Sequence, residues 1–161
     1  MNFAIVGTPG CGKTTLAKNL ANELGLKIMN EKDFALLNKI GAFNEENELE
    51  IPIKKFEKKA NNFLKNNKGI IFEGHTICEM KLNIDRIILI KIDPEILEER
   101  LRKRNYSELK IMDNVFCEGI EFCKKQVKKN YSTKKIIEIY SMPSSKQTFH
   151  KAIKLLNSKQ Q

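Results

Sequence analysis

The sequence predicts an α/β fold in which a five-stranded parallel sheet is flanked by helices on both faces. Apolar runs at 2–6, 69–73 and 86–92 are strand-sized and nearly continuous, which is typical of strands buried on both faces of a parallel sheet. Helical stretches alternate with these runs, and right-handed crossovers then place helices on both faces. The length of 161 residues and the hydrophobic content of 41% suit a single domain over residues 1–161.

The first half of the chain contains the expected elements in close succession. A strand at 2–6 leads into a helix of about 13–24, for which Gly25 is a suitable C-terminal cap. The elements expected next are a short strand at 26–29, helical stretches near 31–40 and 52–66, and a strand at 69–73. The acidic stretch 45–50 separates the two helical stretches.

The second half continues the alternation. The strand at 86–92 is followed by Asp93 and Pro94, and Pro94 suits the first turn of a helix that extends to about residue 104. Ser107 is the expected N-cap of a further long helix. The apolar residues on or near one face of that helix are Ile111, Val115, Ile120, Cys123 and Val127. A last strand at 135–140 and a closing helix at 145–156 complete the five strands, all of which we expect to be buried.

The segment between the first strand and the first helix has the pattern of a phosphate-binding P-loop. The run Gly7-Thr8-Pro9-Gly10-Cys11-Gly12-Lys13-Thr14 fits G-x-x-x-x-G-K-[ST] in the required setting of strand, loop and helix. Its glycines let backbone N–H groups turn toward phosphates at the positive end of the helix. The pattern predicts a three-layer P-loop NTPase fold that binds a nucleoside triphosphate with Mg²⁺. The residues expected at the nucleotide are Gly10, Cys11, Gly12, Lys13, Thr14 and Thr15, with Lys13 at the transferring phosphoryl group and Thr14 in the Mg²⁺ shell.

The cysteines and the lengths of the apolar runs indicate the cellular compartment in which the protein is expected. The 4 cysteines form no C-x-x-C pair, and one of them lies inside the phosphate loop, which indicates a reducing interior. The longest apolar runs are strand-sized, and the chain opens directly into a strand without a charged leader. We therefore expect a protein with no membrane partner in the cytoplasm, or also in the nucleus if its source is eukaryotic.

The positive charge is concentrated near the C-terminus. The formal net charge is +9, and the segment from Lys124 to Gln161 holds ten lysines and one acidic residue, Glu138. Such a segment is open to two interpretations, a surface for RNA or a ribosome and an ordinary solvated lysine-rich face. No aromatic residues are interleaved with the lysines in an RNA-binding pattern, which favours the solvated face.

Three segments of the chain resemble the atypical adenylate kinases of archaea and eukaryotic nuclei, the adenylate kinase isoenzyme 6 family. They are the phosphate loop through Thr15, Glu73-Gly74-His75 after the third strand, and residues 100–114, which are similar to the family's R-G-Y-S-x-x-K-I-x-E-N stretch. The resemblance covers nearly the whole chain. It implies Mg²⁺-dependent phosphoryl transfer from ATP to AMP with associated ATPase activity. It also implies a link to small ribosomal subunit maturation and rRNA processing, with a uS11-type ribosomal protein and neighbouring rRNA as partners.

The resemblance and the fold together assign roles to Glu73 and His75. In an open α/β sheet, ligands lie outside the carboxyl ends of the strands, so both residues should lie beside the phosphate loop. Glu73 then occupies the place of a Walker-B carboxylate that orients Mg²⁺, where the family often has Asp, and His75 is similar to the family's catalytic histidine. The alternatives are an ordinary acid at a strand end and a histidine that caps a helix.

Arg100 and Arg104 are the expected cations of a lid. They are one helical turn apart, and their forked donors suit phosphate oxygens. By resemblance, a lid segment (about 100–115) includes Tyr106 and Lys110, and a monophosphate-binding segment (about 30–66) holds AMP, although no arginine in it can be named as a clamp. Asn105 replaces the family's glycine and tolerates positive φ. A solvated helix face is the alternative for the two arginines, and the loop 141–144 is the expected cover for the adenine base.

Two other functions remain open at this point. The first is an ATPase assembly factor that binds a uS11-type ribosomal protein and has little true kinase activity. The second is a different small-molecule kinase, such as a shikimate-type enzyme, against which the missing acceptor arginines and the motif at His75 argue.

Overall fold

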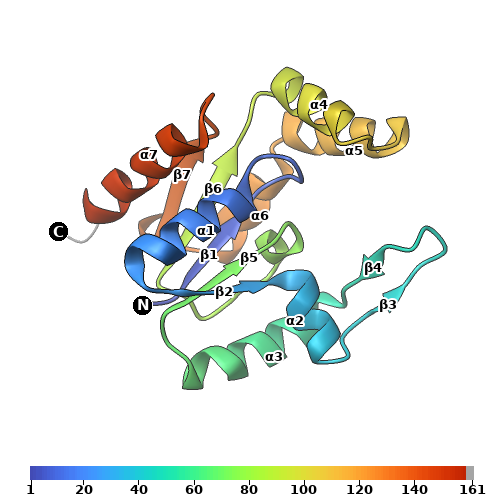
Figure 1. Ribbon diagram of the computed structural model, residues 1–161. Helices are drawn as coiled ribbons and strands as arrows, with labels where there is room; N and C mark the ends of the chain where they lie inside the picture. The colour runs from blue at the N-terminus through green and yellow to red at the C-terminus, as the bar shows by residue number, and fades with distance from the viewer. Residues whose placement is uncertain (159–161) are drawn as a thin grey trace.

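A computed structural model describes residues 1–158 and contains a five-stranded, fully parallel sheet with helices on both faces (Figure 1). The strands in chain order are β1 (Phe3–Val6), β2 (Lys27–Asn30), β5 (Ile70–Glu73), β6 (Arg86–Lys91) and β7 (Ile136–Tyr140). Their order across the sheet is β2-β5-β1-β6-β7. The chain therefore crosses over after each strand, and the order reverses on either side of β1, where ligand sites of open α/β sheets form. This confirms the fold class expected from the apolar runs.

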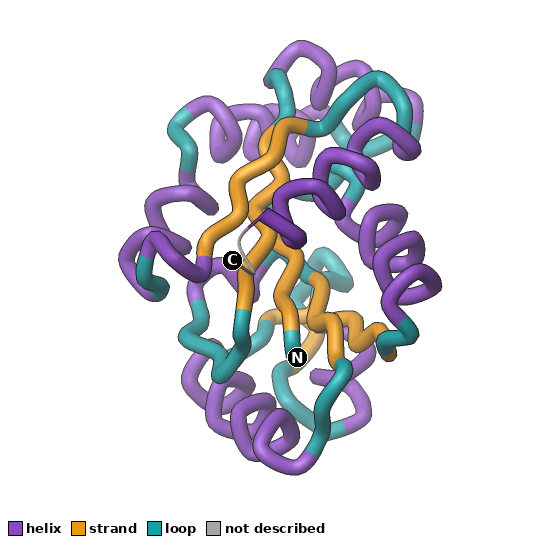
Figure 2. The backbone as a smooth tube through the Cα atoms, turned by 90° about the vertical axis from the view of Figure 1, so that its left-hand side faces the viewer, coloured by secondary structure: helices purple, strands orange, loops and turns teal. Residues whose placement is uncertain are grey.

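The helices and a small hairpin complete the architecture (Figure 2). The helices are α1 (Lys13–Leu24), α2 (Glu31–Leu37), α3 (Ile53–Asn66), α4 (Pro94–Lys103), α5 (Glu108–Gly119), α6 (Phe122–Asn130) and α7 (Ser145–Ser158), with 3₁₀ turns η1 (Thr76–Glu79) and η2 (Thr133–Lys135). The hairpin pairs β3 (Ala42–Phe43) with β4 (Leu49–Glu50) in antiparallel register and projects away from the main sheet (Figure 1). None of the helices within residues 1–158 is long and apolar enough to cross a membrane.

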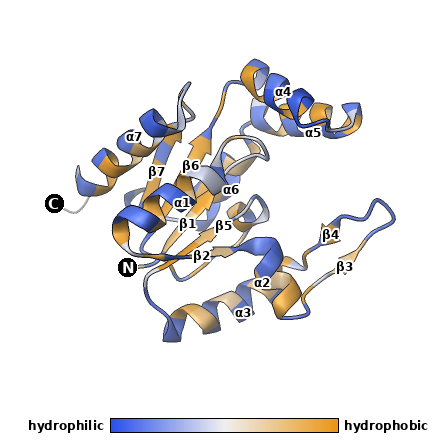
Figure 3. Ribbon diagram, in the orientation of Figure 1, coloured by the Kyte–Doolittle hydropathy of each residue, from blue (hydrophilic) through white to orange (hydrophobic). Residues whose placement is uncertain are grey.

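The sheet separates two hydrophobic cores, because successive side chains of a strand point to opposite faces. The central strands β5 and β6 are coloured mostly as hydrophobic in Figure 3. In β5, Ile70 and Phe72 pack with α2, α3 and α6, whereas Ile71 packs with α1 and α7. The same alternation holds in β6, where Ile87 faces the first core and Ile88 the second. Both faces of the central strands are thus apolar, which is the physical reason that their sequences are continuous apolar runs.

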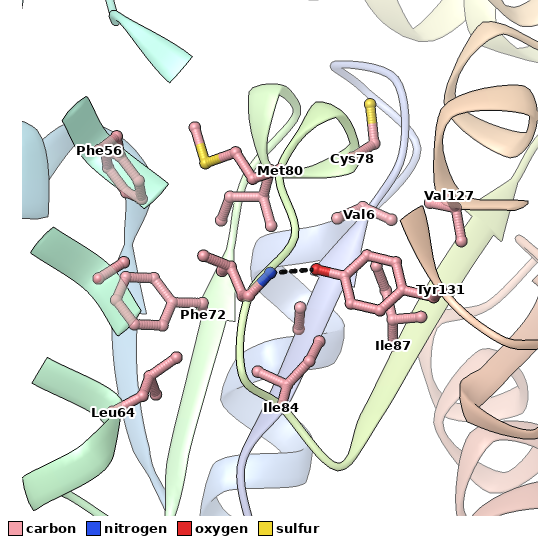
Figure 4. Close-up of a cluster of buried hydrophobic side chains, with 14 of the residues drawn as sticks. Val6, Phe56, Leu64, Phe72, Cys78, Met80, Ile84, Ile87, Val127 and Tyr131 are labelled. Carbon is pink, nitrogen blue, oxygen red and sulfur yellow. Dashed lines mark hydrogen bonds between the residues drawn. The ribbon is translucent and has the colours of Figure 1, made fainter. Parts of the chain in front are cut away.

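An aromatic cluster anchors the first core on the α2 and α3 side (Figure 4). The ring of Phe34 lies edge-on to Phe56 and to Phe72, with centroids 5.1 Å apart in each pair. On the other side of the same core, the buried hydroxyl of Tyr131 accepts a hydrogen bond of 2.9 Å from the backbone N–H of Leu82. The cluster fixes α2 and α3 against β5, and so fixes the start of the segment that approaches the candidate site.

Three details differ from the sequence-based expectation. First, β2 is an edge strand and is not fully buried: Ile28 is 38% exposed. Second, the expected long helix after Ser107 is two helices, because Glu121 adopts a left-handed conformation (φ 56°) between α5 and α6. Ile120, expected on the buried face, is 39% exposed at this break. The Glu121 side chain forms ion pairs with Lys91 and Lys124, which stabilise the turn.

The hairpin is the third difference, because the acidic stretch 45–50 was expected only as a separator. Asn44 closes its turn: the side-chain oxygen accepts hydrogen bonds from the backbone N–H groups of Glu46 (3.0 Å) and Glu48 (2.9 Å). Asn47 supplies the left-handed residue of the turn, with φ 59°. With two residues in each strand, the hairpin is too short for a recognisable alternation of apolar and polar residues.

Candidate active site

The phosphate-loop sequence forms a tight loop between β1 and α1. Gly12 precedes the helix in a left-handed conformation (φ 103°) that side chains rarely tolerate, and the Thr8 carbonyl accepts a hydrogen bond of 3.2 Å from the N–H of Cys11. The ammonium of Lys13 folds back over the loop and donates to the carbonyls of Gly7 (2.9 Å) and Thr8 (3.1 Å). The loop therefore holds its cation at the N-terminal end of α1, where the helix dipole also favours an anion.

Thr14 and Glu73 meet directly beside this loop. The Thr14 hydroxyl lies 3.3 Å from Oε1 and 3.4 Å from Oε2 of Glu73, whose side chain is buried at the end of β5. Asn30, at the end of the neighbouring strand β2, donates a hydrogen bond of 2.6 Å to Oε1. The hydroxyl and the carboxylate are hard oxygen donors on one small region of surface, a donor set that fits Mg²⁺ with several retained waters.

His75 lies on the other side of the loop, at the start of η1. Its Nδ1 is 3.2 Å from the carbonyl oxygen of Gly7 and 3.5 Å from Sγ of Cys123. Because a carbonyl only accepts hydrogen bonds, Nδ1 carries the proton, which makes Nε2 the acceptor nitrogen of the neutral ring. Burial opposes the charged ring, but the contacts with Cys123 and Gly7 favour it, and the pKa of His75 is raised on balance.

A second carboxylate, that of Glu31, supports the backbone of His75. Glu31 is the first residue of α2, and its two oxygens accept hydrogen bonds from the N–H groups of His75 (3.0 Å) and Ile77 (3.2 Å). Burial raises the pKa of Glu31 to about 6, although the accepted N–H bonds and the charge of Lys13 act in the opposite direction. Glu31 thus links the start of α2 to the loop that carries His75.

A third carboxylate joins the phosphate loop to the region that follows β6. Glu118 is buried near the end of α5, and its Oε2 accepts a hydrogen bond of 2.5 Å from the hydroxyl of Thr8. Its Oε1 accepts from the N–H of Ile92 at 3.0 Å, directly before the N-cap of α4. One side chain therefore ties together the phosphate loop, the end of β6 and α5.

Arg100 and Arg104 approach the phosphate loop from α4. Nη1 of Arg100 donates to the carbonyl of Gly10 (3.4 Å) and to the hydroxyl of Ser141 (3.1 Å). Next to them is a cavity of about 190 Å³ that Met142 and Thr148 also line. The expected nucleotide-contacting residues that line this cavity are Gly10, Cys11, Gly12, Thr15, Arg100 and Arg104. The loop expected to cover the base contributes Ser141 and Met142 to this cavity, and the Cys11 side chain itself is buried.

A larger cavity, of about 730 Å³, lies between His75, the phosphate loop and the lid segment. Arg104 borders both cavities, and Tyr106 and Lys110 line the larger one. The ammonium of Lys110 pairs at 2.5 Å with Glu48 of the β3–β4 hairpin, so residues of the two segments expected to form a lid and a monophosphate-binding segment touch across this cavity. A volume of this size suits a nucleotide-sized ligand.

The structure brings Lys13, Thr14, Glu73 and His75 together and places Arg100 and Arg104 at the same end of the sheet. Sequence reasoning missed Asn30, Glu31 and Glu118. Asn30 is the last residue of β2 and Glu31 follows it, so the rule that ligand-facing residues lie at strand ends could have found them. Glu118 carries no such signal, because its partner Thr8 is 110 residues away.

A family model and several curated proteins match most of this chain. A family model described as AAA domain matches residues 4–121. A protein named putative adenylate kinase from Methanocaldococcus jannaschii is 36% identical over 127 residues, which cover 76% of this chain and 70% of that protein. A protein of the same name from Pyrococcus abyssi is 38% identical over 121 residues, which cover 75% of this chain and 65% of that protein. The chain thus spans about two thirds of the length of the curated relatives that it matches.

Solved structures share the fold at low sequence identity. A shikimate kinase from Acinetobacter baumannii in complex with shikimate superposes with a TM-score of 0.68 at 18% identity, and covers 98% of this chain and 93% of the other. A deoxyadenosine kinase from M. mycoides with bound dATP gives a TM-score of 0.61 at 19% identity, with coverages of 98% and 100%. Both are similar to this chain in the arrangement of the sheet and its helices.

Proposed function

The chain belongs to the AAA domain family and to the P-loop nucleoside monophosphate kinases represented by its archaeal relatives, and we propose that it transfers the terminal phosphoryl group of ATP to AMP in a Mg²⁺-dependent reaction. The observation that carries this proposal is the convergence of Lys13, Thr14, Glu73 and His75 on one loop at the end of the sheet. The closer assignment to the adenylate kinase isoenzyme 6 type rests on the motifs at Glu73–His75 and 100–114, and is part of the proposal.

On the donor side, each of the loop residues has a specific task. Lys13 exchanges the carbonyls of Gly7 and Thr8 for the β- and γ-phosphates, which are stronger acceptors because they are charged. Thr14 and Glu73 would hold Mg²⁺, with Asn30 fixing the carboxylate. The ion would supply positive charge beside the phosphate oxygens.

His75 and the arginines act where the phosphoryl group moves. Nε2 of the neutral His75 ring would accept a hydrogen bond from a water beside the acceptor phosphate, and in the protonated ring it would donate to a phosphate oxygen. Arg104 borders both cavities and bridges donor and acceptor sides, while Arg100 is tied to the phosphate loop itself. Planar guanidinium groups stabilise charge spread over several phosphate oxygens.

We assign AMP to the larger cavity. It lies between the monophosphate-binding segment, which reaches it through Glu48, and the lid segment, which reaches it through Tyr106 and Lys110. No arginine lies between residues 30 and 66, so the acceptor phosphate would take its positive charge from Arg104 and Lys110 of the lid. ATP occupies the smaller cavity and the phosphate loop, with its base beneath Met142.

The deciding experiment compares AMP-dependent ADP formation with AMP-independent phosphate release, using purified protein, ATP and Mg²⁺. A kinase forms ADP in proportion to AMP and loses both reactions on Lys13→Ala, because the cation at the transferring group is removed. Activity of Lys13→Ala within threefold of wild type contradicts the assignment of the loop. Phosphate release unaffected by AMP supports the ATPase alternative, and shikimate in place of AMP tests the third possibility.

The second candidate function is an ATPase assembly factor in small ribosomal subunit maturation, including rRNA processing, which binds a uS11-type ribosomal protein and neighbouring rRNA. The observation that favours it is a set of exposed lysines on α6 and η2: Lys125, Lys128, Lys129 and Lys134. Lys128, Lys129 and Lys134 lie toward the end of the sheet where β7 begins, away from the phosphate loop, so a partner bound there leaves the nucleotide site open.

A further inference from the structure

The carboxylate of Glu31 occupies a position that a nearby glycine makes available. Glu31 begins α2, yet its side chain extends to the loop after β5 and caps the first N–H groups of η1, those of His75 and Ile77. The first N–H groups of a helical turn have no partner within the turn, and Ile77 is buried, so this cap replaces water that the site excludes.

Gly74 is the residue that admits the carboxylate. A Cβ added at Gly74 would overlap Oε2, Cδ and Cγ of Glu31. The backbone cannot easily move aside, because the N–H of Gly74 donates a hydrogen bond of 3.2 Å to the carbonyl of Ile5 in β1. Gly74 needs no left-handed conformation, so the reason for glycine here is the close approach of Glu31.

We propose that Glu31 is a positioning residue that holds His75 in its working orientation, and that Gly74 lacks a side chain in order to admit it. His75 is then fixed from two sides: Glu31 binds its backbone N–H, and Gly7 and Cys123 contact its ring. The inference rests on the proposed function, in which His75 acts at the reacting centre. It adds a link between that residue and the monophosphate-binding segment, which begins at the same turn.

The contacts of Glu31 predict the effect of replacing it by Gln. In Glu31→Gln, the amide oxygen still accepts one hydrogen bond, but the NH₂ group faces the other backbone N–H, so two donors confront each other. The cap over His75 and Ile77 is then incomplete, while the phosphate loop, Thr14 and Glu73 keep their contacts. A shift of about 1 Å at a reacting group costs up to about 100-fold in rate, whereas uniform binding of ATP is retained.

The first test is a double-mutant cycle of Glu31→Gln and His75→Ala, measured as kcat and KM for ATP on the full chain. Glu31→Gln is expected to lower kcat by about tenfold or more with KM for ATP within about threefold, and to have no further effect in the His75→Ala background. The matched control is Asp33→Asn, an exposed acid in the same helical turn, which should keep wild-type kcat. The inference is overturned if Glu31→Gln lowers kcat further in the His75→Ala background. It is also overturned if Glu31→Gln keeps the wild-type kcat while His75→Ala lowers it.

The second test does not depend on activity. Gly74→Ala should lower the Tm, and Glu31→Ala combined with it should be less destabilising than the sum of the two single changes, because the overlap is removed. The NMR resonances of the His75 ring should also shift in Glu31→Gln and stay unchanged in Asp33→Asn. A wild-type kcat in His75→Ala would reject the proposed role of His75 in the reaction. The Tm values and the His75 resonances would still show whether Glu31 fixes the position of His75. Strictly additive stabilities with unchanged His75 resonances overturn the inference.

Discussion

Glu31, Glu73 and Glu118 all place carboxylates at the phosphate-loop end of the sheet, and their partners give them different roles. Glu73 faces the hydroxyl of Thr14 and can accept a metal ion. Glu31 and Glu118 use both oxygens on hydrogen-bond donors of the protein itself. The sequence motif identified Glu73 alone; the position of Glu31 after an expected strand was a usable signal that was not used, whereas Glu118 meets its partners only through the fold.

The raised pKa of Glu31 predicts an unusual dependence of stability on pH. The carboxyl has a pKa of about 6 in the folded state and an ordinary value of 4.5 when unfolded, so the folded state binds the proton more tightly. The contribution of Glu31 to the free energy of unfolding should therefore increase as pH falls from 7 to 4.5, by about 2 kcal/mol. Chemical denaturation of wild type and Glu31→Gln across this range measures the difference. A difference that is constant, or that shrinks at low pH, contradicts the prediction.

Arg104 and Arg102 provide a matched pair for the lid. Arg104 borders both cavities, whereas Arg102 points to solvent, where it pairs with Glu98 and Glu108. Arg104→Lys keeps the charge but loses the planar fork, so kcat should fall about tenfold or more if two-pronged phosphate contact matters. Arg102→Lys should leave kcat within about twofold. Steady-state kinetics on both variants measures this difference. Equal kcat values for the two variants would mean that Arg104 belongs to a solvated helix face.

At the scale of elements, the sequence predicted what depends on local pattern and missed what depends on distant partners. The strands and α1 were predicted because apolar runs and the glycine-rich loop are local signals. The turn at Asn105 was also anticipated as tolerant of positive φ, and it adopts φ 56°. The break at Glu121 was not predicted, because the ion pairs that stabilise it come from Lys91 on β6 and Lys124. The site shows the same division: the loop follows from a motif, whereas Glu118 meets Thr8 only through the fold.

The contact between Thr8 and Glu118 should be a main link between the phosphate loop and α5. Glu118→Ala leaves the hydroxyl of Thr8 and the N–H of Ile92 without this acceptor in a buried region, and should cost about 1–3 kcal/mol per unsatisfied group. Thr8→Val removes the donor instead, and the two changes should be strongly non-additive. Glu99→Ala, an exposed acid on α4, is the control and should change stability by less than about 0.5 kcal/mol. Additive effects of the Thr8 and Glu118 changes in urea denaturation would contradict the proposed link.

At the scale of the whole molecule, α6 connects the two ends of the sheet. It begins beside His75, through Cys123, and ends before η2 and β7, where several lysines follow one another in the chain. Not all of these lysines are available to a partner. Lys124 pairs with Glu138 at 3.1 Å, and Lys135 donates to the carbonyl of Ile84 at 2.7 Å. The exposed members, which we call the α6–η2 lysines, are Lys125, Lys128, Lys129 and Lys134.

Replacement of the α6–η2 lysines by Gln tests whether this surface binds a partner. If it docks on a uS11-type ribosomal protein with neighbouring RNA, the four changes should weaken association and reduce its dependence on salt between about 50 and 200 mM. AMP-dependent ADP formation should be spared, because most of these lysines lie toward the opposite end of the sheet from the phosphate loop. The matched control replaces four exposed lysines of α3, at positions 55, 58, 59 and 65, and removes the same charge from another element.

The comparison of the two variants separates a specific surface from net charge alone. Association measured by pull-down or by fluorescence titration should fall about tenfold or more for the α6–η2 variant and much less for the α3 variant, since phosphate contacts act within a Debye length of about 10 Å or less. Equal losses would mean that total charge drives association. Binding that is indifferent to all eight lysines and to salt would identify the basic C-terminal third as a solvated surface, which is the interpretation that its plain lysine pattern already favoured.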